Sequence, residues 1–206
     1  MSGAYLGPSS DLNTRRDGRP LILVGTHHKT GTVWMRRLFE GFCAVLGERL
    51  HSGRQQDLPR SAHVFLQNHS RFDVAALGRS YRGLHVIRDP RDVLISAARY
   101  HARASESWLH VRRLRFWGLT YQEVIRRKRS LHEAILFEMD HAGRNAICEM
   151  LVWDRTRAEF CTAKYEDLIE DQSPPLEEAA SIRRPESKCD YLRAVVARRR
   201  GSAGEA

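Results

Sequence analysis

A short apolar run followed by a glycine-containing loop and an amphipathic segment constrains the fold more than any other feature of the chain. Residues 21–25 (LILVG) have the length and the β-branched content of a strand that is buried on both faces. Residues 26–31 form the loop, and from Thr32 onward apolar residues recur at helical spacing, with Arg and Glu between them. The sequence therefore predicts a strand, a tight loop and a helix.

The same unit recurs downstream. A strand is predicted at His63–Gln67 and another at Leu84–Ile87, after which Asp89 and Pro90 suit the N-cap and the first turn of a helix. Periodicity predicts three more elements, namely helices over Tyr121–Glu138 and Arg144–Trp153 and a strand over Phe160–Tyr165. Such alternation indicates an α/β fold, with a parallel β-sheet flanked by helices.

The chain has 206 residues, which is enough for one compact domain. We expect a flexible lead-in over residues 1–18, the α/β domain over residues 19–171, and a loosely ordered basic tail over residues 172–206. No apolar run approaches the roughly 20 residues that span a bilayer, and the first residues lack the basic-then-apolar pattern of a signal peptide. The expected localisation is cytoplasmic, with no transmembrane segment.

Positive charge is concentrated in the middle of the chain. The formal net charge is +9, and residues 79–129 hold thirteen basic side chains against four acidic ones, whereas residues 130–182 hold four against twelve. A basic segment of this density attracts polyanions such as nucleic acid, a membrane surface, or a phosphorylated or sulfated small molecule. Charge alone does not choose among them, and the run from Arg126 to Arg129 is equally typical of a solvated helix face.

The four cysteines, at positions 43, 148, 161 and 189, have no CxxC spacing and are too few for a disulfide scaffold. We expect reduced thiols and no metal site.

The loop over residues 26–31 has the properties of an anion site. A glycine-containing turn at a helix N-terminus presents unpaired backbone N–H groups and the positive end of the helix dipole. Lys29 adds a point charge, and Thr30 and Thr32 add hydroxyl donors. The NTP-binding loop GxxxxGK[ST] does not match, because Lys29 precedes Gly31 instead of following it.

The segment HKTGTVW resembles the PKSGTTW loop of the sulfotransferase family, which binds the 5′-phosphosulfate of 3′-phosphoadenosine 5′-phosphosulfate (PAPS). His28 replaces the family's Pro, and Thr30 replaces its Ser and keeps a hydroxyl. The resemblance implies that Lys29 stabilises the departing 3′,5′-diphosphate (PAP) and that Trp34 offers an aromatic face to the adenine, although Trp34 also suits a core position. The cofactor-binding residues implied in this segment are His28, Lys29, Thr30, Gly31, Thr32, Val33 and Trp34.

Two further segments carry the resemblance, which covers residues 20–171. The segment VIRDPRDVLIS is similar to the family's 3′-phosphate segment, and it implies that Arg88 and Ser96 bind that phosphate. The segment KYEDL is similar to the family's RYEDL, which places Tyr165 near the adenine. The implied fold is a three-layer sandwich like that of P-loop nucleotide hydrolases. The implied reaction is sulfuryl transfer from PAPS to a hydroxyl or amine, without a metal.

The acceptor must lose a proton as it attacks, so a general base is required. The family uses a His in a KTHLP-like segment between the two phosphate motifs, and His69 has the best placement for that role. Gln67 stands where the family has Lys. His63 is an alternative base, and His27 and His28 lie in the phosphate loop, where either a contact to the sulfuryl oxygens or an orientation toward solvent is open.

The sequence departs from the family at its carboxyl end, where nothing after Tyr165 matches the late RKGxxGxW-like segment that closes over the nucleotide. Two alternatives therefore stay open: a catalytically impaired PAP- or PAPS-binding homologue, and a basic nucleic-acid-binding protein. The expected acceptor is a small molecule, a carbohydrate or a lipid, in a pocket built from Ala102–Leu119. No nucleic-acid partner is expected, and neither the acceptor nor the oligomeric state follows from the sequence.

Overall fold

The computed structural model of the protein describes residues 19–170 as one continuous stretch. The predicted lead-in over residues 1–18 and the predicted tail over residues 172–206 lie outside this stretch.

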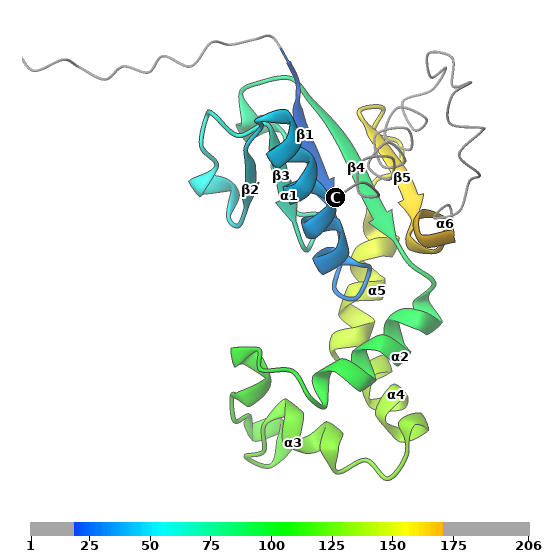
Figure 1. The fold of residues 1–206 in the computed structure, drawn as a ribbon. Coiled ribbons are helices and arrows are strands. Elements are labelled where there is room, and N and C mark those ends of the chain that lie inside the picture. The colour runs from blue at the N-terminus through cyan, green and yellow to red at the C-terminus, as the bar shows by residue number, and fades with distance from the viewer. Residues whose placement is uncertain (1–18, 171–206) are drawn as a thin grey trace, which may run out of the picture.

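A five-stranded, all-parallel sheet forms the upper part of the molecule (Figure 1). Its order is β2-β3-β1-β4-β5, so β1 lies in the middle, where Val24 pairs with Leu66 of β3 on one side and with Leu84 of β4 on the other. The strands are β1 (Leu21–Gly25), β2 (Leu50–Ser52), β3 (Val64–Gln67), β4 (Tyr81–Ile87) and β5 (Phe160–Lys164).

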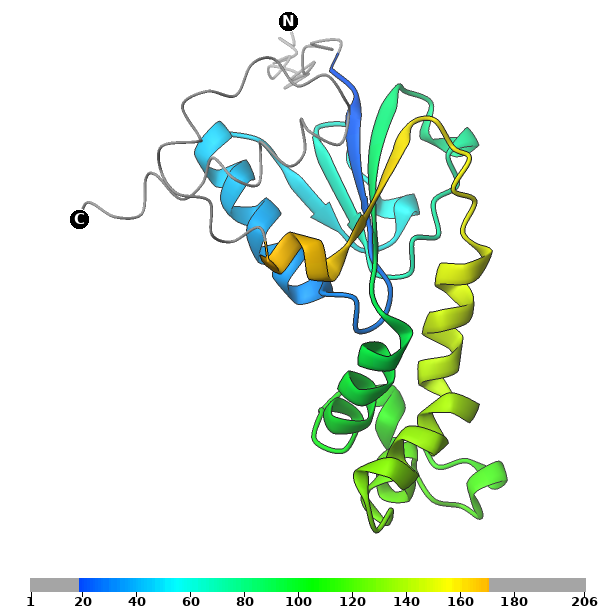
Figure 2. The same ribbon diagram turned by 90° about the vertical axis from the view of Figure 1, so that its right-hand side faces the viewer.

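Six α-helices accompany the sheet within the described residues: α1 (Thr32–Leu46), α2 (Pro90–His101), α3 (Tyr121–Arg126), α4 (Leu131–Asp140), α5 (Ala142–Val152) and α6 (Tyr165–Glu170). Helices α1 and α6 cover one face of the sheet, where Met35 and Leu168 join the core that contains Val24 (Figure 2). Leu23 points to the opposite face and packs with Phe65 and with residues from loops. Burial on both faces explains why β1 is apolar at every position.

Helices α2 to α5 lie below the sheet and form a helical lobe with a core of its own (Figures 1 and 2). Its core contains Leu109, Phe116, Tyr121 and Phe137, all of which are buried. Because β4 runs directly into α2, this helical lobe is attached at the carboxyl edge of the sheet.

The α/β class, the parallel sheet and four of its five strands are confirmed. Strand β2 was not predicted, because its three residues include only one apolar side chain, Leu50. The helix predicted over Tyr121–Glu138 is wrong as a single element: it is divided into α3 and α4, since the Ser130 side chain accepts a hydrogen bond from the Glu133 backbone N–H and starts a new helix. Asp89 is the N-cap of α2, as predicted, and accepts from the Arg91 N–H at 2.8 Å.

Cys43 and Cys148 are free thiols, whereas Cys161 of β5 takes part in a disulfide. The prediction of a reduced thiol is therefore wrong for Cys161, because spacing along the chain does not exclude a bond between cysteines that folding brings together. No helix between residues 19 and 170 has both the length and the apolar composition needed to cross a bilayer. Within the same range, no group of three or more His, Cys, Asp or Glu side chains is arranged to hold a metal ion.

Candidate functional site

The predicted site residues follow the carboxyl ends of parallel strands, which all lie at one edge of the sheet. Lys29 follows β1, His69 follows β3, Arg88 follows β4 and Tyr165 follows β5. The connection that leaves β1 returns to β2 on one side of the sheet, while the connection that leaves β4 returns to β5 on the other. Adjacent strands whose connections diverge in this way form the usual ligand crevice of an open α/β sheet.

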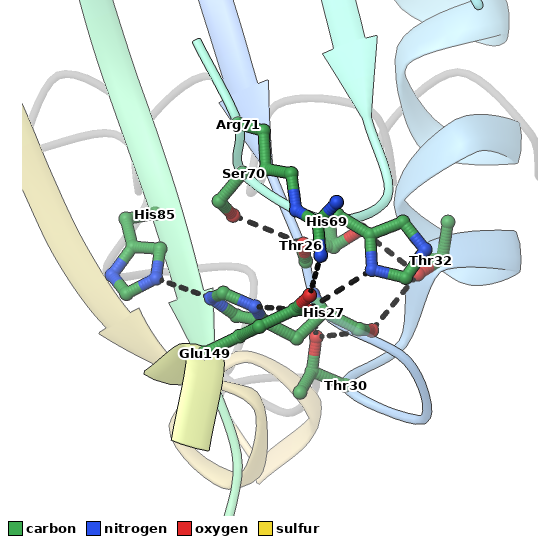
Figure 3. Close-up of polar contacts among 9 residues, drawn as sticks. All are labelled: Thr26, His27, Thr30, Thr32, His69, Ser70, Arg71, His85 and Glu149. Atoms are coloured by element: carbon green, nitrogen blue, oxygen red, sulfur yellow. Dashed lines mark hydrogen bonds and ion pairs between the residues drawn. The ribbon is translucent and has the colours of Figure 1, made fainter. Parts of the chain in front are cut away.

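Side chains within the loop between β1 and α1 hold its shape (Figure 3). The Thr30 hydroxyl accepts from the His27 N–H at 2.7 Å and donates to the His27 carbonyl at 3.0 Å. The Thr26 and Thr32 hydroxyls are 2.8 Å apart. Because the Thr30 side chain is fully buried and bonded to the loop itself, its hydroxyl is not available to a ligand in this arrangement.

The N-terminus of α1 is free of competing negative charge. Gly31 occupies the N-cap position with φ of 92°, no side chain caps the helix, and its first turn contains no acidic residue. The backbone N–H groups of the first turn are therefore open to an anion, together with the positive end of the dipole of a 15-residue helix.

Lys29 is half-buried. Its backbone is left-handed, with φ of 66°, and its Nζ lies 3.4 Å from the centroid of the Tyr100 ring. Burial lowers the pKa of the Lys29 ammonium, with partial compensation from the Glu106 carboxylate. The cation–π contact with Tyr100 thus restrains the position of the Lys29 ammonium group, which would be mobile in an exposed lysine.

Arg88 joins the two phosphate motifs. Its Nη1 donates to the Lys29 carbonyl at 3.0 Å, and its Nη2 lies 3.8 Å from the Asp92 carboxylate. The Glu166 carboxylate lies 4.0 Å from Nε, an ion-pair distance too long for a hydrogen bond, so Nε is buried without a hydrogen-bond partner. An orphaned guanidinium N–H at this edge is a donor that an anion could use.

The ring of Tyr165 packs against Gly31 of the first motif and Arg88 of the second. A Cβ on Gly31 would come within 2.5 Å of its ring, and the Arg88 Cζ lies 4.7 Å from its centroid. The Trp34 ring meets the same ring edge to face, with centroids 6.2 Å apart. Trp34 is partly buried against the core that contains Val24 and Met35, so the core position that the sequence also allowed is confirmed.

A cavity of about 620 Å³ opens where the loop meets α2. It brings together three of the predicted residues, Lys29, Arg88 and Ser96. Its full lining is Lys29, Arg88, Asp92, Ile95, Ser96, Arg99, Tyr100, Arg103 and Ala104. With four cationic side chains and one carboxylate, the cavity favours an anion with more than one charged group.

Arg99 and Arg103 line the cavity beyond Ser96 and add two positive charges to it. Residues 96, 99 and 103 are spaced so that they lie on one side of a helix. Neither guanidinium makes a hydrogen bond or ion pair to another side chain within residues 19–170, and both are exposed. They were not among the predicted site residues, since an isolated arginine on an exposed helix face carries no motif.

His69 and Arg71 converge on one carboxylate, that of Glu149 from α5 (Figure 3). The Nδ1 of His69 lies 3.0 Å from Oε2, and the Arg71 Nη2 lies 2.6 Å from Oε1. Interactions with His27, His69 and Arg71 hold the pKa of Glu149 well below its usual range, against the opposing effect of burial. In the neutral imidazole that donates Nδ1–H to the ionised Glu149, the Nε2 atom of His69 carries the free lone pair.

His27 does not point to the loop's exterior. It is buried, its Nε2 lies 2.8 Å from the Nε2 of His85, and its Nδ1 lies 3.5 Å from Glu149, within ion-pair range but without hydrogen-bond geometry (Figure 3). Burial first, and then His27, lower the pKa of His85 to about 3. His85 is therefore uncharged at neutral pH, and its contact with His27 packs the loop against the sheet.

His28 begins a buried polar chain that the sequence analysis missed. Its Nε2 lies 2.7 Å from the Nε2 of His101, and the Nδ1 of His101 lies 2.7 Å from Oε1 of Glu138. His101 and Glu138 are completely buried. Burial first, and then His101, lower the pKa of His28 to about 4.

With Glu138 ionised and both imidazoles neutral, these contacts define one arrangement of protons along the chain. The Glu138 carboxylate then accepts from His101 Nδ1–H, and the Nε2 of His101 accepts from His28 Nε2–H. The Nδ1 of His28 is consequently the nitrogen with a free lone pair. The only sequence signal for this chain was a polar residue on an otherwise apolar helix face, as at His101 and Glu138.

Of the predicted site residues, only Lys29, Arg88 and Ser96 line the cavity, and the others, His69 included, do not. His63 precedes β3 at the amino edge of the sheet, where its Nδ1 lies 2.7 Å from Glu48. Val33 is exposed on the first turn of α1, so only its backbone N–H faces the anion position that the loop defines.

No family model matches this chain, and no curated protein sequence matches it either. The likeness to sulfotransferases therefore depends on the three sequence segments.

Proposed function

We propose that this protein is a sulfotransferase that transfers a sulfuryl group from PAPS to a hydroxyl or amine acceptor and releases PAP. The proposal includes the finer fold assignment, a three-layer sandwich like that of P-loop nucleotide hydrolases. The observation that carries it is the meeting of two segments 59 residues apart: the Arg88 guanidinium bonds the Lys29 carbonyl, and both side chains line one cationic cavity.

The residues present fit a nucleotide with two separated anionic groups. Lys29, from the loop that leads into the uncapped N-terminus of α1, lines the cavity together with Ser96, Arg99 and Arg103. Arg88 lines the same cavity, where its Nη1 donates to the Lys29 carbonyl and its buried Nε has no hydrogen-bond partner. PAPS would supply an activated sulfuryl group on its 5′-phosphate and a second phosphate on its ribose.

The protein's own task is to hold charge in place as the sulfur–oxygen bond breaks, because transfers of this kind depend on positioning and electrostatic stabilisation. Lys29 would face the bridging oxygen, with its direction fixed by Tyr100. The backbone N–H groups at the start of α1 would bind the 5′-phosphate, while Arg88 and Ser96 would bind the 3′-phosphate.

We propose His69 as the general base. Its proton on Nδ1 is directed to Glu149, which leaves Nε2 to take the acceptor's proton and stabilises the cation that forms. His28 is the second candidate, because the chain through His101 to Glu138 leaves its Nδ1 unprotonated and would stabilise a cation in the same way.

The experiment that tests the proposal is a calorimetric titration with PAP, accompanied by a thermal-shift series, because any ligand selective for the folded state raises the melting temperature. AMP, which lacks the 3′-phosphate, is the matched ligand control. PAP binding with sulfate transfer to one member of an acceptor panel supports the proposal. PAP binding without transfer favours the impaired homologue, and the absence of any shift at millimolar PAP contradicts both.

A further inference from the structure

The segment between α2 and α3 ends in a tip that exposes large apolar side chains. Leu114 and Trp117 are each 96% exposed, and Val111 is 53% exposed. Leu114 begins a single turn of 3-10 helix over Leu114–Phe116 and Trp117 follows it, in the helical lobe away from the sheet (Figure 1). We call residues 111–117 the apolar tip.

The apolar tip is held rigidly. Arg112 and Thr120 form an antiparallel bridge, and the Arg113 backbone exchanges hydrogen bonds of 3.1 Å with Leu119 and Gly118. Between the exposed side chains, Phe116 turns inward to the core of the lobe. The exposure of Leu114 and Trp117 is therefore built into an ordered turn.

Trp117 also has a strained backbone. Its φ is 55°, in the left-handed region that disfavours residues with a side chain, and it is followed by Gly118 at φ of 78°. Trp117 therefore has an unfavourable backbone conformation, and its large apolar side chain is exposed to water. Such a combination at a surface is typical of a functional position.

Cations surround the apolar tip. Arg112 and Arg115 are exposed beside it, and residues 102–129 hold eight basic side chains against two acidic ones. Both acidic side chains are engaged: Glu106 accepts from Tyr100 and Trp108, and Glu123 accepts from the Thr120 N–H. The segment thus carries a net positive charge, of which Glu123 offsets a part through its interaction with Arg112.

We propose that the apolar tip docks the protein onto the surface of a lipid bilayer that contains anionic lipids. Leu114 and Trp117 would enter the interface between headgroups and acyl chains, where tryptophan is favoured, and the arginines would bind the anionic headgroups. This proposal does not depend on the proposed function, because it concerns a different surface and a different ligand.

The size and shape of the tip favour a bilayer over a protein partner. A tryptophan side chain offers about 250 Å² at most, whereas a stable protein interface buries about 800 Å² on each side. A protruding pair of side chains would need a matching pocket in a protein, but a bilayer accepts it anywhere. Nucleic acid would pair with the arginines but would leave Leu114 exposed.

The test is co-sedimentation of the full chain with vesicles of phosphatidylcholine alone and with vesicles that also contain phosphatidylserine. We expect binding to the mixed vesicles, weakened by salt, and a loss of at least about tenfold in the double variant Leu114→Ser with Trp117→Ser. The double variant Leu151→Ser with Val152→Ser removes an exposed apolar pair from α5 and should bind as the unmodified chain does. Quenching of tryptophan fluorescence by brominated lipid should disappear in Trp117→Phe.

Because Leu114 and Trp117 are almost fully exposed, their variants should keep the melting temperature of the unmodified protein. Three results would overturn the proposal. The first is equal vesicle binding by the Leu114 and Trp117 double variant. The second is no binding to either vesicle. The third is dimerisation without lipid that requires Trp117, since this would assign the apolar tip to a second copy of the chain.

Discussion

The ring of Tyr165 occupies the space that a side chain on Gly31 would need: a Cβ built on Gly31 would lie 2.5 Å from Cε2 of that ring. The two residues are far apart in the sequence, in the first and third segments that resemble sulfotransferases. Their contact packs the N-cap residue of α1 against the residue that follows β5, and Arg88 lies over the same ring. A small residue is therefore required at position 31 for two reasons, its positive φ and its neighbour.

We expect Gly31→Ala to destabilise the fold more than Gly47→Ala does. Both glycines have positive φ, but nothing lies within 4 Å of a Cβ at Gly47. The left-handed backbone alone costs about 1 kcal/mol, so that figure should describe Gly47→Ala, and the collision with Tyr165 should add to it for Gly31→Ala. Urea unfolding measures both, and the difference should shrink when each variant also carries Tyr165→Ala. Equal losses would mean that the ring moves aside freely.

Arg88→Ala should weaken PAP binding by about ten- to a hundredfold, which corresponds to about 1.5 to 3 kcal/mol for a charge-assisted hydrogen bond. Arg91→Ala is the matched control, because Arg91 is exposed, pairs with Asp89 and does not line the cavity. Titration calorimetry with PAP checks both variants. An Arg91 effect as large as that of Arg88 would indicate general electrostatic attraction instead of a specific site.

Lys29→Met should lower the rate of sulfate transfer by about a hundredfold or more while the melting temperature stays close to that of the unmodified protein. Methionine keeps the packing against Tyr100 but removes the charge that would stabilise the leaving diphosphate. Release of PAP from PAPS in the presence of a working acceptor measures the rate. A normal rate in this variant would remove Lys29 from the reaction.

The base should be identified by comparing His69→Gln with His28→Gln. If His69 is the base, His69→Gln should lower the transfer rate by about 10²- to 10⁴-fold with little change in PAP affinity, and Glu149→Gln should shift the pH–rate profile. His28→Gln should then keep most of the rate. The opposite pattern would assign the proton transfer to His28 and its chain to Glu138.

Stability should fall as the pH falls from 6.5 toward 4. The pKa of His28 is lowered to about 4 and that of His85 to about 3, against an ordinary value of 6.5. In this window the unfolded chain binds protons that the folded protein does not, so acid favours unfolding. We expect His28→Gln to flatten the dependence of the free energy of unfolding on pH, measured by urea titration. His110→Gln, at an exposed position, should leave the slope unchanged.

The sequence by itself determined the local elements. The apolar run of β1, the cap and first turn of α2 at Asp89 and Pro90, and the loop with its lysine all follow from interactions between near neighbours in the chain. Lys29 and Arg88 were expected in one site from the resemblance alone, and their contact is possible because residues after the carboxyl ends of parallel strands meet at one edge. Sequence periodicity failed where the signal was a single cap, as at Ser130, or a single apolar side chain, as at Leu50.

Only the tertiary structure decided which polar side chains form hydrogen bonds with one another and which charged groups are restrained by packing. The pairing of His28 with His101, 73 residues away, and of His69 with Glu149, 80 residues away, depends on how α2 and α5 pack below the sheet. Packing likewise turned the Thr30 hydroxyl inward and laid Lys29 on Tyr100. Burial and hydrogen bonding set these properties, and both depend on neighbours that the fold brings close, which no local pattern of residues encodes.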